Sequence, residues 1–151
     1  MEQEKAMGRY RWIPALAGLA LLGCVVGEKS AHGFRLPDGD PAHGRQVFLD
    51  LKCNACHEVA GEDLPGPVAD PPLGFELGGV VTSVKTDGEL VTAIVDPSHR
   101  LVAASPPDRV ASGGLSRMGD FSEAMTVRDL IDVVAYLHTR YEVVSPSSIG
   151  P

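Results

Sequence analysis

The sequence has few aromatic residues and no apolar run long enough for a permanent membrane span. Phe, Trp and Tyr together make up 5% of the 151 residues, although 44% of the chain is hydrophobic. We therefore expect something other than aromatic side chains to fill part of the core. At this length the chain has room for one domain and some tail, so a second domain is not expected.

Basic side chains are outnumbered by acidic ones. There are 13 Lys and Arg against 20 Asp and Glu, which gives a net charge of -7 and a pI near 5.1. Binding to nucleic acid needs clustered Lys and Arg that neutralise phosphates, so this composition argues against a nucleic-acid partner. An acidic protein instead favours a partner whose docking surface is basic.

The three cysteines do not form a disulfide framework, because their number is odd and two of them lie close together. Cys53 and Cys56 are separated by two residues, and Cys24 stands alone near the N-terminus. The 17 Gly and 12 Pro indicate much loop, and no pattern is strong enough to predict a β-sheet.

Residues 1–23 have the layout of a secretory signal peptide. The segment opens with a basic stretch that contains Lys5, Arg9 and Arg11. The apolar run that follows extends only from Ile13 to Leu22, whereas a spanning helix needs about 20 apolar residues. A removed signal is therefore favoured over a permanent anchor, and we expect an exported protein.

Leu21-Leu22-Gly23-Cys24 resembles a bacterial lipobox, in which the signal is cut before the cysteine and that cysteine receives a lipid. The pattern predicts a lipid on Cys24 and a flexible tether over residues 24–39, which have no apolar period. The alternative is that Cys24 is a small apolar residue in an ordinary signal that is cut near Ala31. The lipid would hold the protein on the periplasmic side of a bacterial membrane.

Three segments of the remaining chain have helical patterns. Asp40 followed by Pro41 is a helix start, with apolar positions at helical spacing behind it. A second helix is expected from about Asp87 to Val95, and a third over about 126–141. Between them, the Gly- and Pro-rich stretches are expected to be loops. We expect the folded domain to cover residues 40–142, followed by a disordered tail at 143–151.

Cys53-Asn54-Ala55-Cys56-His57 fits the C-x-x-C-H pattern of covalent haem attachment. Two cysteines at this spacing on a tight turn reach the two vinyl groups of one porphyrin, and His57 is directed at the iron. A thioredoxin-like dithiol lacks the surrounding βαβ pattern, and half of a zinc site lacks a second Cys or His pair. The export signal favours haem, because this attachment takes place outside the cytoplasm.

A haem bound in this way needs a sixth iron ligand, and thioether sulfur suits electron transfer at high potential. Met118 is the candidate, because it lies in a Gly-rich loop shortly before the final helix. Met125 at the helix boundary and His99 after the second helix remain alternatives, as does an open site.

With these residues in place, the sequence resembles the class I cytochrome c family from about Asp40 to Tyr141. The order is the family's: helix, C-x-x-C-H, Pro-rich loop, middle helix, Met loop and terminal helix. The resemblance implies an all-α fold of three to five short helices around one covalent haem c, with crossed N- and C-terminal helices. It also implies that one pair on the first helix meets one pair on the last, namely Gly44 and Phe48 with Val133 and Tyr136.

The resemblance further implies a partner for the ring of the haem-binding histidine. In the family, the carbonyl of a proline after the motif accepts a hydrogen bond from the second ring nitrogen of that histidine. Pro67 fits this place, and Pro71 with Leu73 fits nearly as well.

The function that the resemblance implies is that of a mono-haem carrier of single electrons between redox partners outside the cytoplasm, not that of an enzyme. Glu58, Glu62 and Asp63 are expected either to steer a basic partner toward the haem edge or only to keep the surface soluble. Two other interpretations remain. One is a dedicated haem subunit of a periplasmic oxidoreductase, and the other is a five-coordinate haem sensor or peroxidase.

Overall fold

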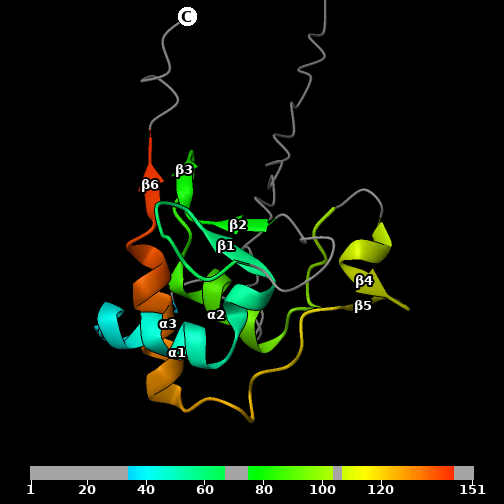
Figure 1. Ribbon diagram of the computed structural model, residues 1–151, viewed down its shortest axis with the longest axis horizontal. Helices are drawn as coiled ribbons and strands as arrows, with labels where there is room; N and C mark the ends of the chain where they lie inside the picture. Colours follow the sequence, from blue (N-terminus) through cyan, green and yellow to red (C-terminus); the bar gives the residue numbers. More distant parts are fainter. Residues whose placement is uncertain (1–33, 67–74, 104–106, 145–151) are drawn as a thin grey trace, which may run out of the picture.

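The computed structural model describes residues 34–66, 75–103 and 107–144. Its α-helices are α1 (Pro41–Asp50), α2 (Asp87–Val95) and α3 (Val127–His138), and two 3-10 turns are η1 (Cys53–Ala55) and η2 (Pro107–Arg109). Figure 1 shows the three α-helices packed together, with the strands above and beside them. The expected signal peptide, Cys24, Pro67 and the end of the tail lie outside the described residues.

Six short strands pair at the edges of the helical core (Figure 1). They are β1 (His57–Val59) parallel to β2 (Phe75–Leu77), β3 (Gly79–Val81) parallel to β6 (Tyr141–Val143), and β4 (Ala111–Ser112) antiparallel to β5 (Leu115–Ser116). Strands this short do not show the alternation from which strands are predicted. The expectation of a fold without strands is therefore wrong, while its helical class holds. No helix in the described ranges is long and apolar enough to cross a membrane.

The first two α-helices begin at side-chain caps, and both starts agree with the prediction. Oδ1 of Asp40 accepts hydrogen bonds from the backbone N–H groups of Ala42 and His43, at 2.9 and 3.2 Å. Thr86 opens α2 through a capping box with Glu89. The sequence predicted the Asp40 cap and the start of α2 at Asp87; the capping box of Thr86 and Glu89 adds the local reason for the second start.

Helix α3 begins at Thr126, as predicted, but it ends three residues before the predicted position near residue 141. Its last turn tightens, because the N–H of Thr139 donates to the carbonyl of Tyr136 at 3.0 Å. Tyr141 then leaves the helix to begin β6, which pairs with β3. The helix is shortened by a partner strand that lies far away in the sequence.

Helices α1 and α3 touch at Gly44, where a Cβ atom would overlap the carbonyl oxygen of Asp132. One turn later, Phe48 packs edge-on against Tyr136, with ring centroids 5.7 Å apart. Each of these two aromatic residues is only 2% exposed. The few aromatic residues thus include the largest side chains of the core. The rest of the core consists of Val47, Val59, Leu90, Ile94, Val133, Val134 and Leu137.

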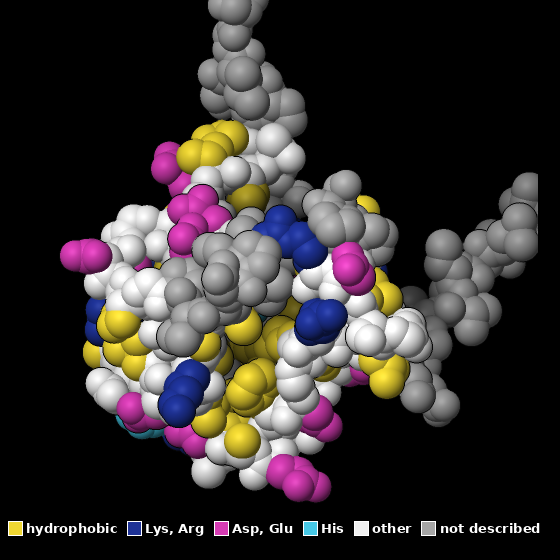
Figure 2. All heavy atoms as spheres, turned by 45° about the vertical axis from the view of Figure 1, so that its right-hand side comes forward, with side chains coloured by type: hydrophobic (Ala, Val, Ile, Leu, Met, Phe, Trp, Pro, Cys, Tyr) yellow, Lys and Arg dark blue, Asp and Glu magenta, His cyan; other side chains and the backbone are white. Residues whose placement is uncertain are grey.

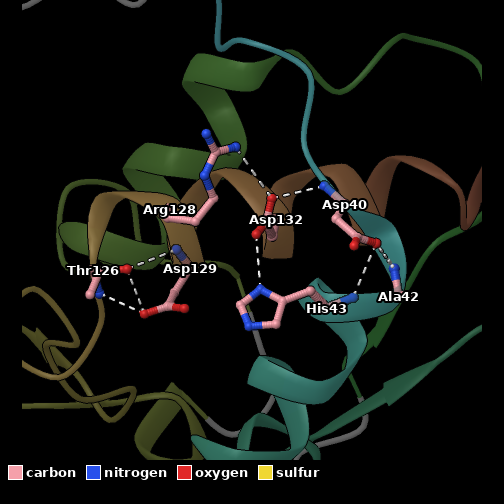
Figure 3. Close-up of polar contacts among 7 residues, drawn as sticks. All are labelled: Asp40, Ala42, His43, Thr126, Arg128, Asp129 and Asp132. Atoms are coloured by element: carbon pink, nitrogen blue, oxygen red, sulfur yellow. Dashed lines mark hydrogen bonds and ion pairs between the residues drawn. The ribbon is translucent and has the colours of Figure 1, made fainter.

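A buried carboxylate joins the start of α1 to α3. Asp132 is 2% exposed, and its Oδ1 accepts a hydrogen bond from the backbone N–H of Asp40 at 2.8 Å. Its Oδ2 lies 2.9 Å from Nδ1 of His43, and Arg128 is a more distant ion-pair partner at 3.8 Å (Figure 3). The amide of Asp40, more than any other group, holds the pKa of Asp132 below its ordinary value.

The residues just before α1 also lie against the domain. The backbone N–H of Leu36 donates to Oδ2 of Asp87 at 2.8 Å, and the Leu36 side chain packs against the core. Residues 34–39 are the described part of the expected tether. Within them, Leu36 is bonded to the first residue of α2.

We expect Gly44→Ala to lower the free energy of unfolding by about 3 kcal/mol or more, because the added methyl group forces α1 away from α3. Denaturant titration of the purified protein measures this loss. Gly66→Ala is the control, since a Cβ atom there meets nothing within 4 Å and the stability should change by less than about 1 kcal/mol. Equal stability of the two variants would contradict the close helix contact.

We expect Asp132→Asn to destabilise the protein and to flatten the acid side of its stability profile. The pKa of Asp132 is lower in the folded state than in the unfolded state. The charged carboxylate therefore stabilises the fold above about pH 4, and this stabilisation is lost as the pH falls through the folded-state pKa. Denaturant titrations between about pH 7 and pH 3 measure the profile. The exposed Asp38→Asn variant should keep the acid slope of the parent protein; an unchanged slope in Asp132→Asn would disprove the role of Asp132.

Candidate functional site

The Cys53–His57 motif lies on a tight turn that begins where α1 ends. Lys52 follows the helix in the left-handed region, with φ 58° and ψ 31°. This conformation costs a non-glycine residue roughly 1–2 kcal/mol. The chain then forms η1, in which the N–H of Cys56 donates to the carbonyl of Cys53 at 3.2 Å. The helix end and this turn together place two thiols and an imidazole within a segment of five residues.

The two cysteines of the motif form no disulfide with each other, and both are half-buried. Cys53 packs against the hydrophobic core, and its burial raises the pKa of its thiol to about 11. A redox dithiol works through an accessible thiolate with a lowered pKa, so the burial of Cys53 argues against that alternative. A zinc site needs further ligands beside the two cysteines. Among the described residues, no group of three or more His, Cys, Asp or Glu side chains is placed to hold a metal ion.

The backbone of His57 is held by its neighbours on both sides. His57 begins β1, where it pairs with Phe75 of β2. The side-chain amide of Asn54 donates to the carbonyl of Pro65 at 3.2 Å, which ties the turn to the loop after β1. Val59 is buried in the core two residues later. The half-buried side chain of His57 is therefore attached to a backbone segment whose movement is restrained.

One face of the molecule is hollowed and apolar. Figure 2 shows hydrophobic side chains forming the walls and floor of this hollow, with Lys and Arg side chains near its rim. Several apolar residues pack against the core and remain partly exposed, including Leu51, Cys53, Leu64, Val91, Val95, Met125 and Leu130. A porphyrin presents two broad apolar faces, so an apolar hollow of this kind suits a haem.

The three candidates for the sixth ligand lie in different surroundings. Met118 is half-buried in the loop between β5 and α3, whereas the residues on either side of it are exposed. Its backbone N–H donates to Oγ of Ser116 at 3.1 Å. Met125 packs against the core, as expected for a structural residue, and His99 is exposed in the turn after α2.

Acidic residues surround a cavity of about 510 Å³ beside His57. Of the three predicted acidic residues, Glu58 and Asp63 are exposed, but Glu62 is not available as a surface charge. Its two carboxylate oxygens each lie 2.9 Å from a guanidinium nitrogen, one of Arg45 and one of Arg140. Sequence reasoning missed this pairing, because the three residues are far apart in the chain. It also missed the exposed Glu76, which lines the same cavity.

The Cytochrome c family model matches residues 41–140, which is well over half of the chain. The matched range begins at the first residue of α1 and contains the cysteine turn, α2, Met118 and α3. Comparison with curated proteins and with solved structures found no match. The chain therefore belongs to the class I cytochrome c family, and its cofactor is covalent haem c.

Proposed function

We propose that this protein is a mono-haem cytochrome c that carries single electrons between redox partners outside the cytoplasm. The coarser statement, a haem-based electron-transfer protein, follows from the family. The observation that carries the proposal is the turn after α1, which presents two thiols and an imidazole with Cys53 packed against the apolar core. Haem, when bound there, supplies an iron that alternates between its ferric and ferrous forms.

We propose that Cys53 and Cys56 would form the thioether bonds to the haem, and that His57 and Met118 would bind its iron. With both of these ligands retained in either oxidation state, no ligand bond would have to form or break during electron transfer. Such an arrangement favours a carrier over an enzyme, which agrees with the general role of the family.

Hydrogen bonds hold the proposed Met118 ligand loop in place. The backbone N–H of Met118 donates to Oγ of Ser116, and the backbone N–H of Ser116 donates to Oγ of Ser98 at 3.0 Å. The N–H of Arg117 donates to the carbonyl of Val110 at 2.8 Å. The loop is thereby tied both to the segment after α2 and to the one before β4, which limits how far the thioether moves.

We also propose that the His57 ring donates a hydrogen bond to the carbonyl of Pro67, a residue just beyond the described range. The contact between Asn54 and Pro65 supports it, because that contact holds the start of the same loop against the cysteine turn. We also propose a docking surface for a basic redox partner around the exposed Glu58, Asp63 and Glu76.

Cytochrome c domains typically work outside the cytoplasm, and we propose the same location for this protein. Its N-terminal pattern supports the finer proposal of a lipid on Cys24 that holds the domain on the periplasmic side of a bacterial membrane.

We expect the double variant Cys53→Ala/Cys56→Ala to lose covalent haem completely, because no sulfur remains to bond the vinyl groups. Haem staining after denaturing electrophoresis and the mass of the intact chain measure the attachment. Cys24→Ala is the matched control, since it removes the other cysteine and should leave the haem in place. Covalent haem that persists in the double variant would refute the assignment.

We expect Met118→Ala to remove the far-red sulfur-to-iron absorption band of the oxidised protein and to lower the reduction potential, while haem stays attached. Loss of the thioether removes the ligand that favours ferrous iron. Absorption spectra and a redox titration measure both effects. Met125→Ala should keep the band, and a band lost only in Met125→Ala would transfer the ligand role to Met125.

A further inference from the structure

Glu62 is held between two arginines, one in α1 and one just after α3. Its Oε2 accepts from Nε of Arg45, in the middle of α1, and its Oε1 lies 2.9 Å from a terminal guanidinium nitrogen of Arg140, just after α3. The Glu62 side chain is only 15% exposed. A carboxylate with this little contact with water needs such partners, because an unpaired buried charge is costly.

The ion pair between Arg45 and Glu62 joins two residues that flank the haem-attachment motif in the sequence. Arg45 precedes Cys53 along the chain and Glu62 follows His57, so every residue of the motif lies between the two ends of this ion pair. Because the pair joins α1 to the segment after β1, it closes the part of the chain that carries the thiols and the imidazole into a loop. The guanidinium group keeps its charge at any working pH, and the hydrogen bond to Glu62 raises the pKa of Arg45 further.

Arg140 is itself held on two sides, so it is a firm second anchor for Glu62. Its backbone carbonyl accepts a hydrogen bond from Gly79 of β3 at 2.9 Å. Its guanidinium carbon lies 5.6 Å from the centre of the Tyr136 ring, within the range of a cation–π contact. The ring packs in turn against Phe48 of α1, and its burial raises the pKa of Tyr136.

A tight turn connects Glu62 directly to the end of β1. The N–H of Glu62 donates to the carbonyl of Val59 at 3.1 Å, and Gly61 takes a positive φ of 71° inside this turn. The next residue after Val59, Ala60, donates its N–H to the carbonyl of Leu77 at 2.9 Å. His57 begins the same three-residue strand, and both His57 and Glu62 line one cavity.

We propose that Glu62 is a positioning residue for His57: its carboxylate, held by Arg45 and Arg140, fixes the strand from which the proximal imidazole approaches the haem iron. The inference rests on the proposed role of His57 as the axial ligand. Glu62 would then position a residue of the haem site, whereas its charge alone suggested that it steers a partner or keeps the surface soluble. The clamp, formed by Arg45, Glu62 and Arg140, would fix the orientation of the His57 ring and limit the movement of the β1 backbone.

The test uses Glu62→Gln in the full-length holoprotein, because this change removes the anion and keeps the size of the side chain. The hyperfine-shifted haem methyl resonances of the oxidised protein report the orientation of the axial ligands, and we expect their spread to change. Amide hydrogen exchange reports the rigidity of the segment, and we expect exchange at residues 60 and 62 to become about tenfold faster or more. Covalent haem should remain at the level of the parent protein.

Glu58→Gln is the matched control, since it removes the same charge from an exposed residue next to His57 and leaves the clamp intact. It should preserve both the resonance pattern and the amide exchange. If Glu62→Gln does not fold, Arg45→Gln replaces it, because Glu62 then keeps Arg140 as a partner; Arg45→Lys should restore the parent pattern in part.

Parent-like resonances and exchange in Glu62→Gln, or an equal change in Glu58→Gln, would overturn the positioning role. Failure of the proposed function has a different signature, because a parent protein without covalent haem would contradict it before any variant is compared. In that case, exchange at residue 60 would still decide whether the clamp stiffens β1.

Discussion

The close contact between α1 and α3 at Gly44 is the constraint on which the rest of the structure depends. Because a side chain at this position would overlap the backbone of α3, the helices meet only with glycine there. The contact brings Phe48 against Tyr136, and α1 ends two residues after Phe48. Since the cysteine turn begins directly after that end, the same contact determines where the haem-binding residues stand relative to the core.

Two carboxylates reinforce this contact from either side. At the start of α1, the carboxylate of Asp132 is hydrogen-bonded to the backbone N–H of Asp40 and to the ring of His43. Further along α1, the carboxylate of Glu62 accepts a hydrogen bond from Arg45. Each is largely withdrawn from water, and each is satisfied by at least two partners. A buried carboxylate that loses such partners is strongly destabilising, so these residues favour one arrangement of the two helices over its near alternatives.

In the described part of the chain, several apolar residues that pack against the core stay partly exposed. Cys53 belongs to this group, and so does Met125. A covalent haem against this face would add apolar contact where the polypeptide provides little of its own, and the thioether bonds would make that contact permanent. Cofactor binding and completion of the core are therefore one event in the function that we propose.

The sequence by itself determined the features that depend on near neighbours in the chain. The cysteine motif, the caps at Asp40 and Thr126 and the bounds of α2 each arise from residues within a few positions of one another. The match of the family over residues 41–140 agrees with the resemblance that the motif carried. Local hydrogen bonds and local spacing suffice for such features, because no distant partner takes part.

Only the tertiary structure decided which distant residues meet. The strand pairs, the early end of α3 and the burial of Asp132 all join segments that are far apart in the sequence. The pairing of Glu62 with Arg45 and Arg140 also largely withdraws from water a side chain that in an isolated glutamate is normally exposed. The free energy of such contacts depends on how the whole chain packs, and no pattern of neighbouring residues encodes it.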